Sequence, residues 1–135
     1  MIAKATPRPA TEAQRKDLIA VIVPHSDLAA EYVVLAAMLH HPDLAGPHVS
    51  GLHPADWATE LHRIMARIGL AHLRSIGRVD CRQLIDVLRD GGAVRPQAFA
   101  VELATLARVA ELIHTGGIVA DAVAGITAHR RGAAA

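Results

Sequence analysis

The sequence predicts an all-α fold: a compact, single-domain bundle of five to six helices. The chain has 135 residues, the length of one domain, and 52% of them are hydrophobic. Only Tyr32, Trp57 and Phe99 are aromatic. A core of small aliphatic side chains suits closely packed helices better than a sheet, which favours β-branched and aromatic residues. Apolar residues also recur at spacings of three and four, as on one face of a helix, and no segment has a convincing strand pattern.

The chain divides into three segments by pattern. We expect an N-terminal arm over 1–22, a helical domain over 23–131 and a disordered tail over 132–135. Pro7 and Pro9 favour disorder at the start of the arm, whereas residues 11–23 have some helical character. The arm is therefore expected to be partly disordered or to contain a short helix.

The first clear helical pattern begins at Ser26 or Asp27, either of which can cap a helix N-terminus. Its apolar face comprises Leu28, Tyr32, Leu35 and Leu39. Pro42 closes this helix. Residues 42–53 are rich in proline and glycine, which predicts a loop with room for one short turn.

A second helix is expected from Pro54, which suits the first helical turn, to about Ser75, before a break at Gly77. Its apolar residues are Trp57, Leu61, Ile64 and Ile68. Asp80 and Gln83 have the spacing of a capping box and predict a third, shorter helix. That helix carries Leu84, Val87 and Leu88 and is expected to stop in the left-handed conformation at Gly91-Gly92.

Pro96 can begin the next helix, which we expect to end at Gly116-Gly117. Its inward residues are Phe99, Leu103, Leu106, Ala110 and Ile113. A last helix is marked by Val119, Val123 and Ile126 and fades towards His129.

Charge and cysteine content exclude several classes of protein. The formal net charge of +1 is too small to indicate a nucleic-acid or membrane surface by itself. A single cysteine, Cys81, excludes an intramolecular disulfide and suits a reducing compartment. No apolar run reaches the ~20 residues of a membrane-spanning helix, and the run 18–23 is too short for a signal peptide. We expect a cytoplasmic protein without a membrane partner.

The nine histidines raise the question of a metal site. Four of them, His40, His41, His48 and His53, fall near the expected loop, but no cysteine pair or His-Glu helix motif accompanies them. Glu111 and His114 have the Glu-x-x-His spacing of di-iron bundles, but only one copy is present. We therefore expect solvated loop histidines, and no bound metal or other cofactor.

No group with the features of a catalytic residue emerges from the sequence. Cys81 follows the expected cap Asp80, and a helix N-terminus can lower a thiol pKa. No sequence feature supplies a base beside it, although a distant histidine could. The chain also lacks the glycine-rich motifs that bind nucleotide phosphates. We expect a protein that is not an enzyme.

One cationic series stands out, and it contains Arg63, Arg67, Arg74, Arg78, Arg82 and Arg89. Arg63, Arg67 and Arg74 can share one helical stripe. Carboxylates at Glu60, Asp80, Asp86 and Asp90 interrupt the positive field, so a solvated helix face is the simplest interpretation. The alternative is a docking surface for an acidic protein or a nucleic acid, with Arg63, Arg67, Arg74 and Arg78 as its candidate residues.

The order of short motifs carries a resemblance to a known family. The first runs from Val23-Pro24 through Ala30-Glu31 to Val34-Leu35 and Met38-Leu39. The later ones are Asp56-Trp57, His62, Val79-Asp80, Leu84 with Leu88, Gly92 with Val94, and Phe99 to Leu106. With these gaps, residues 23–130 resemble the N-terminal domain of the DnaB family of replicative helicases. The signature residues are Glu31, Leu35, Trp57, His62, Asp80, Leu84, Leu88, Gly92 and Phe99.

Some positions depart from the family pattern. Ala36 stands where the family often has glycine, Trp57 replaces phenylalanine, and Ala58 replaces a common tyrosine. We expect a stand-alone copy without the long helical hairpin, the linker helix and the ATPase domain of the family. From the residues alone, Trp57 and Phe99 are expected to be core anchors, and His62 a packed or hydrogen-bonded histidine.

The resemblance implies an orthogonal bundle that supports helicase assembly and contacts primase or a loader. The first hypothesis is therefore a non-catalytic interaction module of DNA replication that binds primase, a replicative helicase or itself, with a C2 dimer as the default assembly. The alternative is a small nucleic-acid-binding regulator that uses the arginine-rich helix face. A third hypothesis, a small enzyme or metal protein, would centre on the histidines.

Overall fold

The computed structural model describes residues 11–23, 28–91 and 95–134. Every regular element in these ranges is a helix, which confirms the all-α prediction. The elements are α1 (Glu12–Ile22), α2 (Ala29–His40), α3 (Pro42–Val49), the 3-10 helix η2 (Pro54–Asp56), α4 (Glu60–Ile76), α5 (Cys81–Asp90), α6 (Pro96–Glu111) and α7 (Gly116–Ala134). Over the same ranges, no helix has the length and apolarity needed to span a bilayer.

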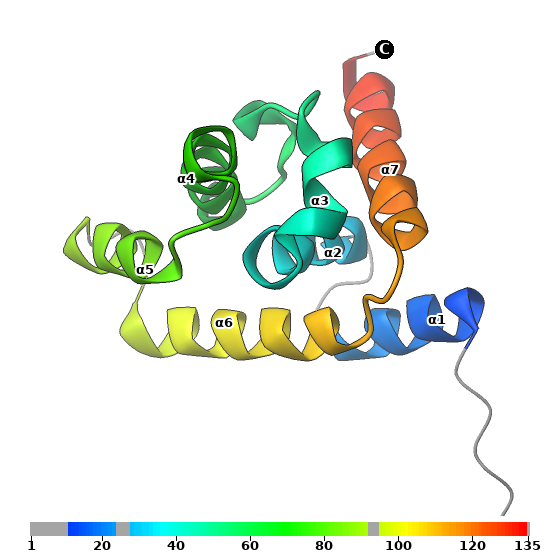
Figure 1. Cartoon of the computed structure of the whole chain (residues 1–135), viewed down its shortest axis with the longest axis horizontal. Helices are drawn as coiled ribbons and strands as arrows, with labels where there is room; N and C mark the ends of the chain where they lie inside the picture. The colour runs from blue at the N-terminus through cyan, green and yellow to red at the C-terminus, as the bar shows by residue number, and fades with distance from the viewer. Residues whose placement is uncertain (1–10, 24–27, 92–94, 135) are drawn as a thin grey trace, which may run out of the picture.

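The helices are arranged around α2 (Figure 1). Helices α1 and α6 follow one another along the base of the molecule, while α7 stands upright near one end and α4 and α5 lie towards the other. Helix α2 packs against α6, α7, α3 and α4. The large changes of direction between consecutive helices agree with an orthogonal bundle.

Helix α2 is buried on nearly all sides, rather than on one face as expected. Every residue from Glu31 to Met38 is buried, and Ala36 and Ala37 have no exposed surface. Small side chains allow neighbouring helices to approach the α2 backbone closely, so an almost wholly apolar helix can occupy the centre of the bundle. The cap position is taken by Leu28 without a side-chain hydrogen bond, and the expected caps Ser26 and Asp27 lie outside the described residues.

The segment expected to be a loop over 42–53 instead contains α3. Pro42 occupies the first turn of α3, where the missing N–H costs nothing, and Pro47 lies inside the helix. Ala45 and Val49 are buried, one turn apart, where α3 packs on α2 and α7. The burial of this apolar edge outweighs the local preference of glycine and proline for a turn.

The second predicted helix begins later than the sequence indicates. Pro54 begins η2, and α4 starts only at Glu60. Thr59 caps α4, because its hydroxyl accepts a hydrogen bond from the His62 N–H (3.1 Å). Trp57 therefore lies in the connecting segment, although it is only 2% exposed. The end of α4 agrees with the prediction, because Gly77 adopts a left-handed φ of 74° directly after Ile76.

The starts of α5 and α6 agree with the sequence, but their ends do not. Asp80 caps α5 by accepting a hydrogen bond from the Gln83 N–H (3.1 Å). Gly91 is not left-handed, since its φ is −74°, and Gly92 lies outside the described residues. Helix α6 ends at Glu111, and Gly116-Gly117 begin α7 instead of ending α6.

The two terminal segments also contain helix. Thr11 and Gln14 form a reciprocal capping box that starts α1, and Ile19 of α1 is buried in the core. Of the two expectations for the arm, the short helix is therefore the one found over residues 12–22. At the other end, α7 runs to Ala134, past residue 132, where a disordered tail was expected.

Candidate functional site

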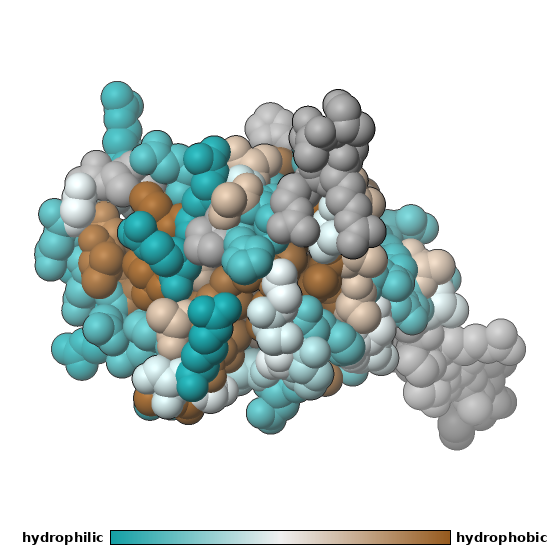
Figure 2. All heavy atoms as spheres, turned by 90° about the horizontal axis from the view of Figure 1, so that it is seen from above, coloured by the Kyte–Doolittle hydropathy of each residue, from teal (hydrophilic) through white to brown (hydrophobic). Residues whose placement is uncertain are grey.

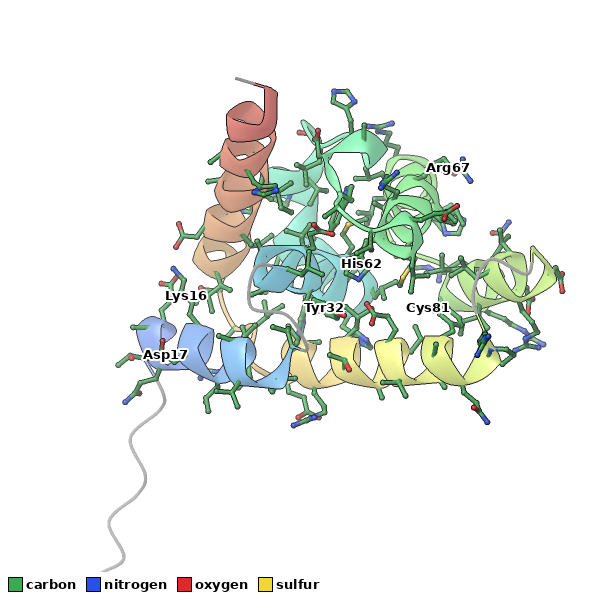
Figure 3. The ribbon with its side chains drawn as sticks, turned by 180° about the vertical axis from the view of Figure 1, so that it is seen from behind. Lys16, Asp17, Tyr32, His62, Arg67 and Cys81 are labelled. Atoms are coloured by element: carbon green, nitrogen blue, oxygen red, sulfur yellow. The ribbon has the colours of Figure 1, made fainter. Side chains whose placement is uncertain are left out.

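Three ionisable side chains from three helices meet inside the bundle. Glu31 lies in the first turn of α2, His62 in the first turn of α4, and Glu102 in α6. The His62 Nδ1 lies 2.9 Å from Glu31 Oε1, and its Nε2 lies 2.5 Å from Glu102 Oε1. The His62 side chain is only 2% exposed. We call Glu31, His62 and Glu102 the Glu–His–Glu cluster. Figure 3 shows His62 among α2, α4 and α6, the helices that supply the cluster.

Further hydrogen bonds satisfy the second oxygen of each carboxylate. The Ala58 N–H donates to Glu31 Oε2 (3.0 Å), and the Tyr32 hydroxyl donates to Glu102 Oε2 (2.9 Å). The Tyr32 ring also meets the His62 ring edge to face, with centroids 4.9 Å apart. Each carboxylate thus has two hydrogen-bond partners, which offsets the cost of burying its charge.

The contacts of His62 favour its protonated form. Both ring nitrogens face carboxylate oxygens, which accept hydrogen bonds when ionised, so both nitrogens donate in the imidazolium form. Burial acts to lower the pKa of His62, but the hydrogen bonds to Glu102 and Glu31 outweigh burial, and the pKa is raised from 6.5. Burial, followed by the hydrogen bond to Glu102, likewise raises the pKa of Tyr32 above its usual value of 10.0.

The Glu–His–Glu cluster holds helices together rather than presenting a reactive group. His62 has almost no exposed surface, and both of its nitrogens already contact protein oxygens. It therefore offers a substrate neither a free lone pair nor an accessible proton. Its effect is to join α2, α4 and α6 through charge-assisted hydrogen bonds.

The sequence interpretation of His62 as a packed or hydrogen-bonded residue agrees with this geometry, but it missed Glu102. A signal was present, because Glu102 lies three residues after Phe99 and four before Leu106, both buried on the inward face of α6. A carboxylate on an inward helical face needs a buried partner. Sequence spacing alone does not indicate which of the distant histidines would supply it.

Arg63 has a structural role next to the cluster. Its Nε donates to the Trp57 carbonyl (3.0 Å) and its Nη2 to the Ala58 carbonyl (3.1 Å). These bonds hold the segment whose Ala58 N–H contacts Glu31. The Trp57 ring lies edge to face against His62, and its buried Nε1 has no hydrogen-bond partner in the described residues.

The other candidate interaction residues lie on the surface. Arg67, Arg74 and Arg78 are exposed and make no ion pair within the described part of the chain (Figure 3 labels Arg67). The stripe is interrupted at Leu70, which is 4% exposed and lines a pocket shared with Pro42 of α3. The structure therefore divides the predicted stripe instead of presenting it as one continuous face.

The remaining signature residues are structural where they are described. Those in the core are Leu35, Leu84, Leu88 and Phe99. Asp80 caps α5, and its own N–H donates to His72 Nδ1 (3.1 Å). These positions determine how the helices start and pack.

The histidines expected in a loop are placed differently. His40 ends α2 and His48 lies in α3, whereas His53 is exposed in a connecting segment. His41 is half-buried, with its Nε2 2.8 Å from the Ala110 carbonyl at the end of α6. Among the described residues, no group of three or more His, Cys, Asp or Glu side chains could hold a metal ion.

Cys81 lacks the environment of an activated thiol. It is exposed at the start of α5 (Figure 3), and its Sγ is directed towards the Val79 carbonyl. Partial desolvation raises the pKa of the Cys81 thiol, and the neighbouring Asp80 carboxylate raises it further. A raised pKa lowers the thiolate fraction at neutral pH, which is the opposite of activation.

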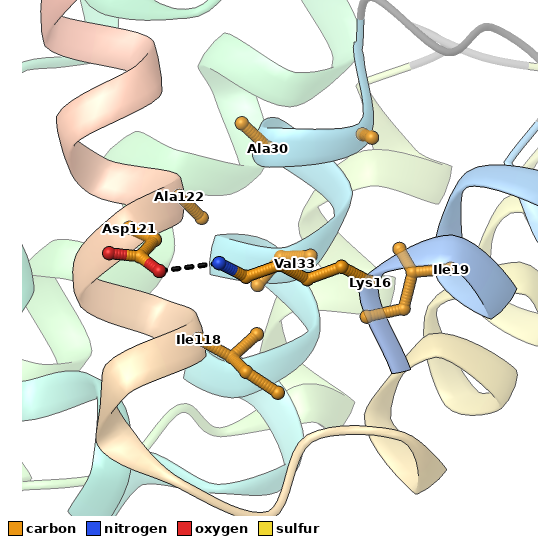
Figure 4. Close-up of a pocket in the computed structure, with 8 residues that line it drawn as sticks. Lys16, Ile19, Ala30, Val33, Ile118, Asp121 and Ala122 are labelled. Atoms are coloured by element: carbon orange, nitrogen blue, oxygen red, sulfur yellow. Dashed lines mark hydrogen bonds and ion pairs between the residues drawn. The ribbon is translucent and has the colours of Figure 1, made fainter. Parts of the chain in front are cut away.

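The surface has hollows with apolar linings. One, of about 260 Å³, lies between α1, α2 and α7, where Lys16 bridges to Asp121 over Val33 and Ile118 (Figure 4). A larger groove of about 570 Å³ lies between α5 and α6. Figure 2, which views the molecule from above relative to Figure 1, shows hydrophobic residues in separate patches between hydrophilic ones.

No protein-family model, curated protein or solved structure matches the chain.

Proposed function

We propose that this chain is a non-catalytic protein-interaction module linked to DNA replication, which binds primase, a replicative helicase or a second copy of itself. The link to replication rests on the ordered motifs that resemble the N-terminal domain of the DnaB family. The interaction role rests on the chemistry of the site.

The observation that carries the proposal is the contact between Glu31 and His62. Both residues belong to the motifs that carry the resemblance, and they meet at 2.9 Å in the interior. Their chemistry is used to hold the fold, so these motifs act as a fold signature rather than as a reaction site. Function is then left to the surface of the domain.

Self-binding is supported by exposed apolar residues on the two helices of the base. Leu18 and Val21 of α1 are 48% and 82% exposed, and Val101 of α6 is 66% exposed. Exposed apolar residues that gather in one patch are typical of surfaces that a second protein covers.

The test is binding to the replication proteins of the source organism. Purified primase and replicative helicase would be passed over the immobilised chain, and analytical ultracentrifugation would measure self-association. We expect micromolar binding to at least one replication protein, or a dimer that weakens in Val21→Lys. No binding to primase or helicase and no dimer at about tens of micromolar, which corresponds to roughly 6–7 kcal/mol, would refute the proposal.

The alternative function, a nucleic-acid-binding regulator, is supported by one observation. Arg67, Arg74 and Arg78 are exposed and make no ion pair within the described residues. Binding driven by phosphate contacts should weaken steeply as salt rises. Gel shifts with duplex DNA and with RNA at low salt test it, with Arg67→Glu/Arg74→Glu as the variant and Arg108→Glu as its control.

A further inference from the structure

We infer that the groove between α5 and α6 is a docking site for an acidic amphipathic helix of a partner protein. The inference deepens the proposed function, since it rests on the chain being an interaction module and names the surface and the chemistry of its partner. It depends on the juxtaposition of an apolar floor with arginines at the rim.

The floor of the groove is apolar and comes from both helices. Ile85 and Leu88 line it from α5, and Phe99 and Leu103 line it from α6. Leu88 and Phe99 are 2% and 7% exposed, so they form the bottom, whereas Ile85 and Leu103 are half-buried on the walls. The volume is about 570 Å³.

The dimensions suit a short helix. The lining residues of α6 run from Pro96 to Leu103, which is about 10 Å along a helix axis. A partner helix of two to three turns covers that length, and apolar residues at every third and fourth position would reach the floor.

The rim is cationic. Arg89 of α5 and Arg95 at the start of α6 line the groove, both are exposed, and neither makes an ion pair within the described residues. Arg82 lies seven residues before Arg89 and therefore on the same side of α5. An apolar floor with unpaired arginines at its edge is complementary to a helix with an apolar face and flanking carboxylates.

No carboxylate is among the residues that line the groove. On α5, Asp86 lies three residues before Arg89 and therefore on the same side of the helix, but it does not line the groove and makes no ion pair within the described residues. Asp90 follows Arg89 by one position and points about 100° further round the helix. On α6, Glu102 contacts His62 in the interior. The lining of the groove therefore carries two arginines and no acidic side chain.

Two other classes of partner fit the groove less well. A nucleic acid would need exposed aromatic rings for stacking or a longer series of cations, and the one aromatic residue of the floor, Phe99, is buried. A membrane surface would need a protruding apolar face, whereas this floor is recessed between two helices. Both are included as outcomes of the test.

The experiment uses the full chain and synthetic stapled helices. The probe has leucine at every third and fourth position and glutamate elsewhere; one control helix has lysine in place of glutamate, and another has glutamine in place of leucine. Fluorescence anisotropy at low salt measures binding. We expect the acidic helix to bind at least tenfold more tightly than either control.

Exposed positions supply the variants. The double variant Arg89→Glu/Arg95→Glu should weaken binding of the acidic helix at least tenfold and improve binding of the lysine helix. Ala100→Glu, which places a charge in the groove, should weaken both helices. The matched control Arg108→Glu, also on α6 but outside the groove lining, should change binding less than twofold. Circular dichroism confirms that each variant folds.

Several results would overturn the inference. The first is equal binding of the acidic and lysine helices, and the second is binding of the acidic helix that Ala100→Glu leaves unchanged. The third is a chain that does not bind the acidic helix but binds duplex DNA or anionic vesicles, and loses that binding in the double variant. If primase or helicase binds and Ala100→Glu has no effect on that binding, the groove fails and the proposed function stands. If the acidic helix binds in the groove and no replication protein binds, the groove stands and the link to replication fails.

Discussion

The His62 imidazole lies between two carboxylates, with Glu31 at 2.9 Å from Nδ1 and Glu102 at 2.5 Å from Nε2. Each of the three residues comes from a different helix, so the contacts join α2, α4 and α6 at one point in the interior. The cluster is the main concentration of buried charge that the described residues contain, and the stability of the domain should depend on it.

Replacing His62 tests this dependence. His62→Leu would leave Glu31 and Glu102 buried without a cation, which costs about 3–5 kcal/mol of unfolding free energy. Urea unfolding followed by circular dichroism measures the loss. The exposed His53 provides the control, since His53→Leu should change the free energy by less than about 0.5 kcal/mol. Equal effects of the two variants would contradict the role of the cluster.

The stability of the domain should also depend on pH. Because the pKa of His62 is raised above 6.5 in the folded chain, its contribution is fully present below that unfolded value. The contribution is lost as pH rises through the folded pKa. We expect the unfolding free energy to fall as pH increases above neutrality, and to fall less in His62→Gln. The imidazolium assignment would be disproved if the unfolding free energy of the wild type rose with pH above neutrality and this rise were absent from His62→Gln.

Tyr32 gives a spectroscopic check, because it is the only tyrosine. Burial and the hydrogen bond to Glu102 raise its pKa above 10.0, so the phenolate absorbance of the folded chain should develop at higher pH than that of free tyrosine. Glu102→Gln should move this titration to lower pH. Tyr32→Phe should cost about 1–3 kcal/mol by removing one hydrogen bond to the Glu102 carboxylate.

Gly77 is expected to contribute through its backbone alone. Its φ is 74°, and no neighbouring atom lies within 4 Å of the position that an added Cβ would occupy. Gly77→Ala should therefore cost about 1–2 kcal/mol from the left-handed conformation, without any steric clash. Gly51 has equally open surroundings and no positive φ, so Gly51→Ala should be close to neutral. Thermal unfolding compares the two variants.

Helix α1 should be held by its apolar contacts and not by its ion pair. Lys16 and Asp121 are 45% and 60% exposed, and exposed pairs contribute at most about 1 kcal/mol. Ile19 is 2% exposed, and truncating such a side chain costs about 2–5 kcal/mol. In limited proteolysis, the Ile19→Ala variant should be cut within α1 faster than the Lys16→Ala variant. The reverse order would show that the ion pair of Figure 4 anchors the helix.

The sequence by itself determined the features that depend on neighbouring residues. Asp80 is three residues from the N–H that it caps, Gly77 needs only its own φ, and Pro96 suits the first turn of α6 because of its own ring. The all-α class follows from the same local information, since apolar spacing and helix propensity act over one or two turns.

Tertiary structure alone decided the features that join distant segments. Glu31 and His62 are 31 residues apart, and His62 and Glu102 are 40 apart, so no local pattern pairs them. Helix α3 forms against the local signal of Gly46 and Pro47 because Ala45 and Val49 bury their side chains on α2 and α7. Burial and charge pairing depend on which surfaces meet in space, and that is settled only when the helices pack.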